Sequence, residues 1–312
     1  MKMKKLWPKT VCILFFLSVM ITQTAWCGQV VVPEIREWAK SALKEEKTLE
    51  TVKGRNSIAI LYFQNKTGDS GLDLLQKGLA FMLITDLSKL ERLQVVERAR
   101  LQALTEEMGF GVSGLVDPDT SPRMGRLVGA QWIVGGDILA QGDVPIHVES
   151  NLLDVPGPYI LGQPTAEGML EQLFRIEKDL LFEIIDLLKI QLTPEERAEL
   201  EKPFSMDIEA LFDLFRGLHA SDEGDYEQAE VYYERAIRRD PEMTPARDSL
   251  AELRSLGLIR PMRKESRQLL HTLRQETSLT DTMTTNETTR REESPEEGAA
   301  NPVTITVPVP QL

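Results

Sequence analysis

Residues Ser57-Ile-Ala-Ile-Leu-Tyr-Phe-Gln64 decide the fold class that this sequence predicts. The run is apolar almost throughout and rich in β-branched and aromatic residues, which is typical of a central strand with both faces buried. A loop of turn-forming residues follows at 65–71, and leucines then recur at helical spacing between Leu72 and Leu90. A buried strand followed by a loop and a helix indicates an α/β protein.

The next segments continue this alternation as far as residue 190. Short strands and amphipathic helices take turns, and the three residues Gln141-Gly142-Asp143 join two of the strands in a tight hairpin. The order predicts an α/β sandwich with a mixed sheet over residues 56–191, preceded by a helical lead-in at 28–55. The expected elements are strand 93–97, helix 98–108, a helix from Ser121 through Leu127, strands 132–139, 144–153 and 159–161, and a long helix over 167–190.

The pattern becomes all-helical over residues 192–275. Thr193-Pro-Glu-Glu196 has the form of a capping box, and residues 210–243 fit a single tetratricopeptide repeat. In such a repeat, small residues let two helices approach closely, tyrosines fill the space between them and a proline follows the second helix. Asp213 and Ala220 depart from the pattern, which has an aromatic residue and a tyrosine there. The matching positions are Gly217, Gly224, Tyr226, Ala229, Tyr233, Ala236 and Pro241.

The repeat allows two interpretations. One repeat cannot bury its own apolar face, so a following helix with Ala246, Leu250 and Leu253 is expected to cover it. The unit then serves as a packing or oligomerisation module. The alternative is a peptide-binding groove, with the concave face formed by Leu211, Leu214, Leu218 and Ser221.

Residues 1–27 have the pattern of an export signal. Four lysines precede an apolar run at 11–21, which is too short for a membrane span, and Ala25-Trp26-Cys27 follows with small outer residues. The sequence before Cys27 resembles a bacterial lipobox, in which the cysteine becomes the lipidated first residue, although Trp26 is bulky for that pattern. Simple cleavage after Cys27 is the other interpretation. Both predict an exported, periplasmic protein, and lipidation would anchor it to the outer membrane.

Composition excludes several function classes. The formal net charge of −13 argues against nucleic-acid binding, and becomes near −17 once the signal is removed. Two cysteines and three widely spaced histidines, at 147, 219 and 271, suggest neither a metal site nor a catalytic constellation, and no cofactor motif is present. Residues 276–312 begin with a Thr- and Glu-rich stretch nearly free of large apolar residues, so we expect a disordered acidic tail.

Five segments carry a family resemblance. They begin with the strand Ile58–Asn65 and the helix Leu79–Leu87. Val96-Glu97-Arg98 then runs into Leu101-Gln-Ala-Leu104, followed by Gly129-Ala-Gln-Trp-Ile-Val-Gly-Gly136 and Leu152-Leu-Asp-Val155. Through these motifs residues 56–190 resemble the curli production assembly/transport component (CsgG/HfaB-like) family, and more loosely the amino-terminal domain of TolB and FlgO-type domains.

The resemblance implies a periplasmic α/β domain of a secretion or surface-associated system, often lipid-anchored to the outer membrane. Pore-forming members insert two long amphipathic hairpins, and the tight turns at 141–143 and 156–158 leave no room for them. The leading hypothesis is therefore a non-enzymatic accessory of secretion or surface-structure assembly that binds envelope proteins, alone or as a homo-oligomer. A lipoprotein-type activator of a peptidoglycan synthase is the alternative, and an outer-membrane channel subunit is disfavoured.

Overall fold

The stretch that decides the fold lies in the middle of a mixed sheet. The computed structural model describes residues 28–46, 56–109, 121–141, 144–157 and 159–259. Within them, seven strands form one sheet with path β3-β1-β4-β5-β6, in which β2 also pairs with β4 and β7 with β5. The pairs among β1 to β4 are parallel, and those of β5 are antiparallel. The strands are β1 (Ser57–Ile60), β2 (Gln64–Asn65), β3 (Gln94–Val95), β4 (Trp132–Gln141), β5 (Val144–Asp154), β6 (Tyr159–Gly162) and β7 (Thr165–Gly168).

The central strand is buried as predicted, but it is split in two. All residues from Ser57 to Phe63 are buried, and regular pairing stops at Ile60 and resumes in β2. Between them the backbone still follows β4, because the Leu61 N–H donates to the Val134 carbonyl at 2.7 Å. The prediction of a strand with both faces covered is therefore confirmed.

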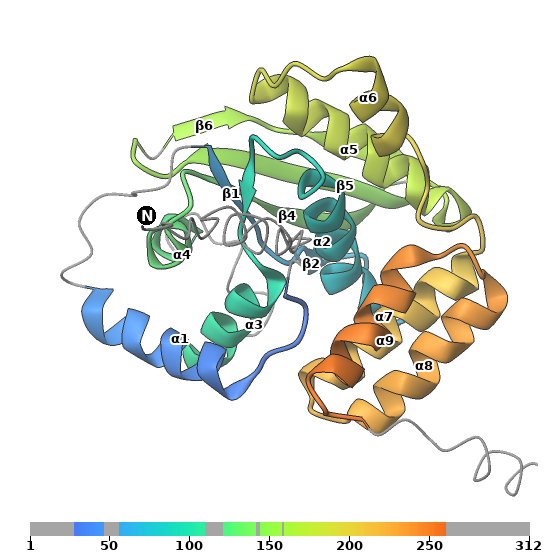
Figure 1. Ribbon diagram of the computed structural model, residues 1–312. Coiled ribbons are helices and arrows are strands. Elements are labelled where there is room, and N and C mark those ends of the chain that lie inside the picture. The colour runs from blue at the N-terminus through green and yellow to red at the C-terminus, as the bar shows by residue number, and fades with distance from the viewer. Residues whose placement is uncertain (1–27, 47–55, 110–120, 142–143, 158, 260–312) are drawn as a thin grey trace, which may run out of the picture. The chain divides into compact units, whose positions relative to one another are not determined.

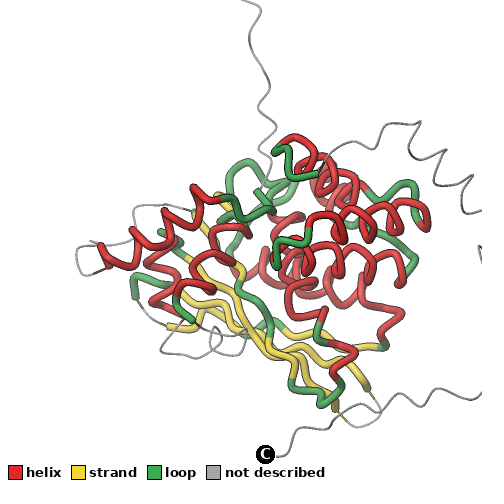
Figure 2. The backbone as a smooth tube through the Cα atoms, turned by 90° about the horizontal axis from the view of Figure 1, so that it is seen from below, coloured by secondary structure: helices red, strands yellow, loops and turns green. Residues whose placement is uncertain are grey.

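Helices pack over the sheet, and further helices form the C-terminal part (Figures 1 and 2). The capping box predicted at α6 is confirmed: the Thr193 hydroxyl accepts from the Glu196 N–H at 3.1 Å, and the Thr193 N–H donates to the Glu196 carboxylate at 2.9 Å. The α-helices are α1 (Pro33–Glu45), α2 (Leu74–Leu87), α3 (Arg98–Glu107), α4 (Ser121–Val128), α5 (Leu173–Leu187), α6 (Pro194–Leu200), α7 (Ile208–Asp222), α8 (Tyr226–Arg239) and α9 (Thr244–Ser255), and single 3₁₀ turns lie at Ser70–Leu72 and Leu170–Gln172.

The long helix predicted from residue 167 begins later than expected. Residues Thr165–Gly168 form β7, which pairs with β5 through Val148 and Ala166 among others, and α5 starts only at Leu173. The free edge of β5 satisfies the backbone of this segment, and Ala166 is buried there. Tertiary pairing therefore overrides the helical pattern of the local sequence.

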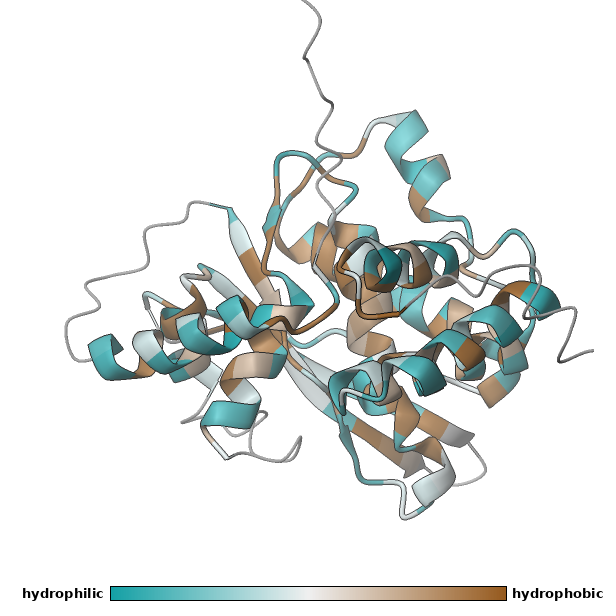
Figure 3. Ribbon diagram, turned by 60° about the horizontal axis from the view of Figure 1, so that its bottom comes forward, coloured by the Kyte–Doolittle hydropathy of each residue, from teal (hydrophilic) through white to brown (hydrophobic). Residues whose placement is uncertain are grey.

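Helix α2 is the centre of the packing. Its residues are buried around nearly the whole circumference, because the sheet and α5 lie against it on one side and α7 on another. Gly78 permits the close approach of α7, since a Cβ at this position would lie 2.6 Å from the Phe215 ring. The sheet, α2 and α7 thus share one continuous apolar core. Figure 3 shows hydrophobic segments in brown on the strands and the helices.

The described residues fall into one compact unit that ends at Ile259. Among the described residues, the strands end at Gly168 and helices follow, and both parts contribute to one core. The domain boundary near residue 192 stays a prediction. Of the predicted lead-in, 28–46 is described and contains α1. The predicted signal at 1–27, with Cys27, and the predicted tail at 276–312 lie outside the described residues. Within the described ranges, no helix has the length and apolar character that a membrane span requires.

Candidate functional site

A buried arginine joins the sheet-bearing part to the helical part. Arg98, the last residue of the Val-Glu-Arg motif and the first of α3, is fully buried. Its guanidinium donates to both carboxylate oxygens of Asp222, at the end of α7, at 2.8 and 3.1 Å. It also donates to the Tyr62 hydroxyl at 3.2 Å. A planar guanidinium with a bidentate carboxylate partner is the strongest form of ion pair available to protein side chains.

A second cation completes the partners of Asp222. The Lys77 ammonium of α2 lies 2.7 Å from its carboxylate. Burial would raise the pKa of Asp222, but the charge of Arg98, with that of Lys77, outweighs burial and holds the pKa below its ordinary value. Three elements, α2, α3 and α7, therefore meet at one ionised carboxylate.

The first described residues form a strap across the same junction. The Gln29 side chain and backbone carbonyl both accept from Arg98. On the other side, the N–H groups of Gln29 and Val30 donate to the Glu252 carboxylate of α9 at 3.0 and 3.1 Å. Burial raises the pKa of Glu252, and these two N–H groups oppose the rise. The strap thus links α3 to α9.

A second ionic cluster lies between α2 and α5. Asp86 is fully buried, contacts the Lys178 ammonium and lies 2.9 Å from the Lys89 ammonium. Lys178 also lies 3.1 Å from the carboxylate of Glu177, which is fully buried. Burial, with the neighbouring charge of Asp86, raises the pKa of Glu177 to about 8, against the opposing effect of Lys178. Burial therefore favours the protonated form of Glu177.

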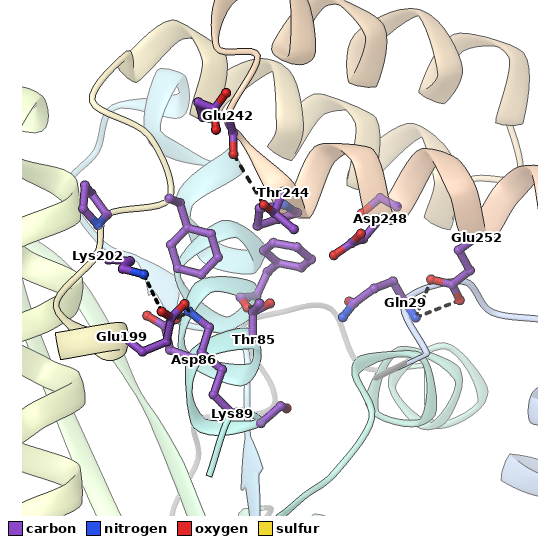
Figure 4. A pocket seen from close by; sticks show the side chains of 16 residues that line it. Gln29, Thr85, Asp86, Lys89, Glu199, Lys202, Glu242, Thr244, Asp248 and Glu252 are labelled. Carbon is purple, nitrogen blue, oxygen red and sulfur yellow. Dashed lines mark hydrogen bonds and ion pairs between the residues drawn. The ribbon is translucent and has the colours of Figure 1, made fainter. Parts of the chain in front are cut away.

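The strap at Gln29 and the second ionic cluster border a pocket of about 760 Å³ between the sheet-bearing and helical parts (Figure 4). Its apolar wall contains the rings of Phe81 and Phe204, whose centroids are 6.5 Å apart. Charged side chains from α2, α6 and α9 surround this wall. The lining residues are Gln29, Phe81, Thr85, Asp86, Ser88, Lys89, Glu199, Lys202, Pro203, Phe204, Glu242, Thr244, Pro245, Asp248, Ser249 and Glu252.

Among the charged side chains of the pocket, Glu199 has two cationic partners. Lys202 and Lys89 both contact Glu199, at 2.6 and 3.8 Å. Burial raises the pKa of Asp248. No histidine or cysteine is among the described lining residues, and no group of metal-binding side chains occurs in the described part of the chain. The pocket offers an apolar wall together with charged side chains, which suits a ligand that carries both kinds of group.

The residues predicted for the tetratricopeptide repeat lie at the contact between α7 and α8. A Cβ at Gly217 would lie 2.4 Å from the Tyr233 ring, so the helices approach as closely as glycine allows. Gly224 has a φ of 79° in the turn between the helices, where glycine avoids strain. Ala229 and Ala236 are buried, Tyr226 is half-buried and Pro241 lies just after α8. The packing fits the expectation, and the repeat assignment itself stays a prediction.

The residues of the alternative interpretation, a peptide-binding groove, are buried in the structure. One face of α7 packs on α2 through Phe215 and Gly78, and another packs on α8 through Gly217 and Tyr233. The chain itself therefore covers these two faces of α7, and a peptide-binding groove stays a prediction. The buried residues are Leu211, Leu214, Leu218 and Ser221.

The main contacts of the junction escaped the sequence analysis. Arg98 belongs to a recognised motif, but its partner Asp222 lies 124 residues further along the chain. One signal was present: Asp222 is spaced seven residues from Phe215 and four from Leu218, so it falls on the buried face of α7. A carboxylate on such a face predicts a buried cation nearby, although it does not say which one.

Residues 39–144, which include β1 to β4, α2 and α3, match the family model described as "Curli production assembly/transport component CsgG". This confirms the predicted resemblance over that range. A protein of Rhizobium meliloti (strain 1021) with the provisional name adenylate cyclase 3 is 27% identical over 165 residues, which are 53% of this chain and 26% of that protein. The chain thus spans about a quarter of the length of this curated relative.

Two solved structures are similar to this chain at low sequence identity. The C-terminal domain of LpoB from Salmonella enterica is 14% identical, covers 43% of this chain and 95% of its own, and has a TM-score of 0.31. Lipoprotein GNA1162 from Neisseria meningitidis is 15% identical, covers 45% of this chain and all of its own, and has a TM-score of 0.32.

Removing one partner of the buried Arg98–Asp222 ion pair should strongly lower the stability of the fold. Asp222→Asn leaves the Arg98 charge buried without its counter-charge, so the free energy of unfolding in urea is expected to fall by about 3–5 kcal/mol. The control is Asp179→Asn, which removes an exposed partner of Arg175 and is expected to cost less than about 1 kcal/mol. Equal losses in both variants would contradict a dominant role of the buried pair.

The raised pKa of Glu177 should make the free energy of unfolding depend on pH. Because its pKa is raised in the folded state, the folded protein holds a proton that the unfolded chain releases, and stability is lost as pH rises from about 4.5 to about 8. Glu177→Gln removes this contribution. Urea unfolding at pH 5 and pH 9 is expected to show a wild-type loss of stability that is roughly 4 kcal/mol larger than that of the variant.

The matched control for this measurement is the exposed Glu171→Gln, which should follow the wild-type pH profile. A Glu177→Gln profile parallel to that of the wild type would contradict the assignment of a buried, protonated carboxyl group.

Proposed function

We propose that this chain is a non-enzymatic protein of the cell envelope that binds other proteins during the assembly of a secretion or surface structure. The observation that carries the proposal is the match of residues 39–144 to a family described by curli production, assembly and transport. The predicted export signal with Cys27 fits a periplasmic location, with or without a lipid anchor at the outer membrane.

The organisation of the described residues supports a binding role. The matched region is joined to the helical part by the Arg98–Asp222 pair, and a pocket with an aromatic wall lies between them. Rigid attachment of a helical hairpin to an α/β domain presents two surfaces at a fixed angle. A partner that contacts both would therefore bind without first ordering a hinge.

Activation of a peptidoglycan synthase is the alternative function, because it also requires only protein binding. The two functions differ in the partner rather than in the chemistry of this chain. Identification of the partner therefore separates them, whereas measurements on the isolated protein do not.

Crosslinking in the intact envelope tests the proposal. A photo-crosslinking residue replaces Asp248 at the pocket of the full-length chain, and a control places it at the exposed Glu171 on the sheet-bearing part. We expect irradiation of the Asp248 variant to capture envelope proteins of a secretion or surface-assembly system. The control variant should capture fewer of these proteins, or different ones.

Capture of a cell-wall synthase would favour the alternative function. Recovery of cytoplasmic proteins alone, or the absence of any product at both positions, would contradict an envelope binding protein.

A further inference from the structure

The helical hairpin of α7 and α8 (Figure 1) contains an unusual carboxylate. Asp213 is fully buried, and it stands where the tetratricopeptide pattern has an aromatic residue. Three arginines converge on it, which we call the Arg cluster: Arg216, Arg235 and Arg239. Their nitrogens lie 2.9, 3.0 and 3.3 Å from the Asp213 oxygens. One buried carboxylate thus gathers three guanidinium groups from two helices.

The charges of this arrangement do not balance. Three cations share one anion, and in the described part of the chain the ion pairs of the Arg cluster are formed with Asp213 alone. The neighbouring Arg238 and Arg254 contact Glu234 instead. The Arg cluster therefore carries an excess of two positive charges in a protein whose net charge is −13. An added anion would relieve the repulsion between the guanidinium groups.

The Arg cluster is both ordered and accessible. The Arg216 guanidinium lies over the Phe212 ring at 5.9 Å, and that of Arg235 lies over the Tyr232 ring at 5.6 Å. The three arginine side chains are 33–42% exposed. Asp213 holds all three guanidinium groups, and aromatic rings also contact those of Arg216 and Arg235. Because these side chains are already ordered, they lose little conformational entropy when a ligand binds.

We propose that the Arg cluster binds an acidic peptide segment of a partner protein through its carboxylates. Guanidinium groups match carboxylates in a bidentate, planar geometry. One turn before Arg235, on the same face of α8, Val231 is 47% exposed and offers an apolar contact. The surface therefore fits a segment in which acidic residues flank an apolar one. This inference rests on the proposed function and adds the chemistry of one partner surface.

The test uses the mature protein from residue 28 and a fluorescent peptide, acetyl-Glu-Leu-Glu-Glu-Leu-Glu-amide, with binding followed by anisotropy. The wild-type protein is expected to bind, and binding should weaken as salt is raised. Arg235→Gln with Arg239→Gln is expected to lower the affinity by about tenfold or more. The matched control, Arg238→Gln with Arg254→Gln, removes the same charge from α8 and α9 and should change the affinity by less than about threefold.

Three results would overturn the proposal. They are no binding by the wild-type protein, equal losses in the two double variants, or binding of phosphatidylglycerol vesicles but not of the peptide, which would identify a lipid anion instead. If the first double variant unfolds, Arg235→Lys with Arg239→Lys keeps the charge and removes only the planar groups, and it should still bind more weakly than the control. A negative result in this peptide-binding test would not contradict the proposed function, because the crosslinking test of that function probes the pocket and not the Arg cluster.

Discussion

The buried ion pair between Arg98 and Asp222 is the contact on which the remaining structure depends. Removing two charges from water is costly, and the cost is offset only if every hydrogen-bonding group finds a partner. Here the Arg98 guanidinium donates to Asp222, Tyr62 and Gln29, and Lys77 supplies the second cation for Asp222. The pair therefore requires α2, α3, α7 and the first described residues to occupy fixed positions together.

The pocket follows from that arrangement. The strap at Gln29 contributes to its lining, and Glu252 of α9 holds the strap through two backbone N–H groups. On the opposite side, Asp86 and Lys178 bring α2 and α5 together beside Phe204. The pocket is thus bordered by polar contacts that fix its walls, which favours a preformed binding surface over one that must be assembled by the ligand.

The sequence predicted those features that depend on local patterns. The apolar run at 57–64 gave a buried central strand, and Thr193 with Glu196 gave a capping box that the structure confirms. Strand β7 escaped prediction because its backbone is satisfied by β5 rather than by its own neighbours. Leucine spacing on α7 has a related limit: it shows that a helix face is apolar, but not that the chain itself buries Leu211, Leu214 and Leu218.

The contacts of the junction could not be predicted, because the residues that form them lie far apart in the sequence. Arg98 and Asp222 are separated by 124 residues, and Gln29 and Glu252 by 223. The spacing of Asp222 indicates a buried position on α7, but no local pattern identifies Arg98 as its partner. Only packing of α7 on α2, which Gly78 permits, brings these charges into one buried network.

Native-state hydrogen exchange tests the central claim, that the sheet-bearing part and the helical part are held together as one cooperative unit. Amide protection in α2 (Leu74–Leu87) and in α7 (Ile208–Asp222) should report the same opening free energy, equal to that of global unfolding. A clearly lower opening free energy for α7, with α2 still protected, would show that the helical part opens independently and would contradict the account.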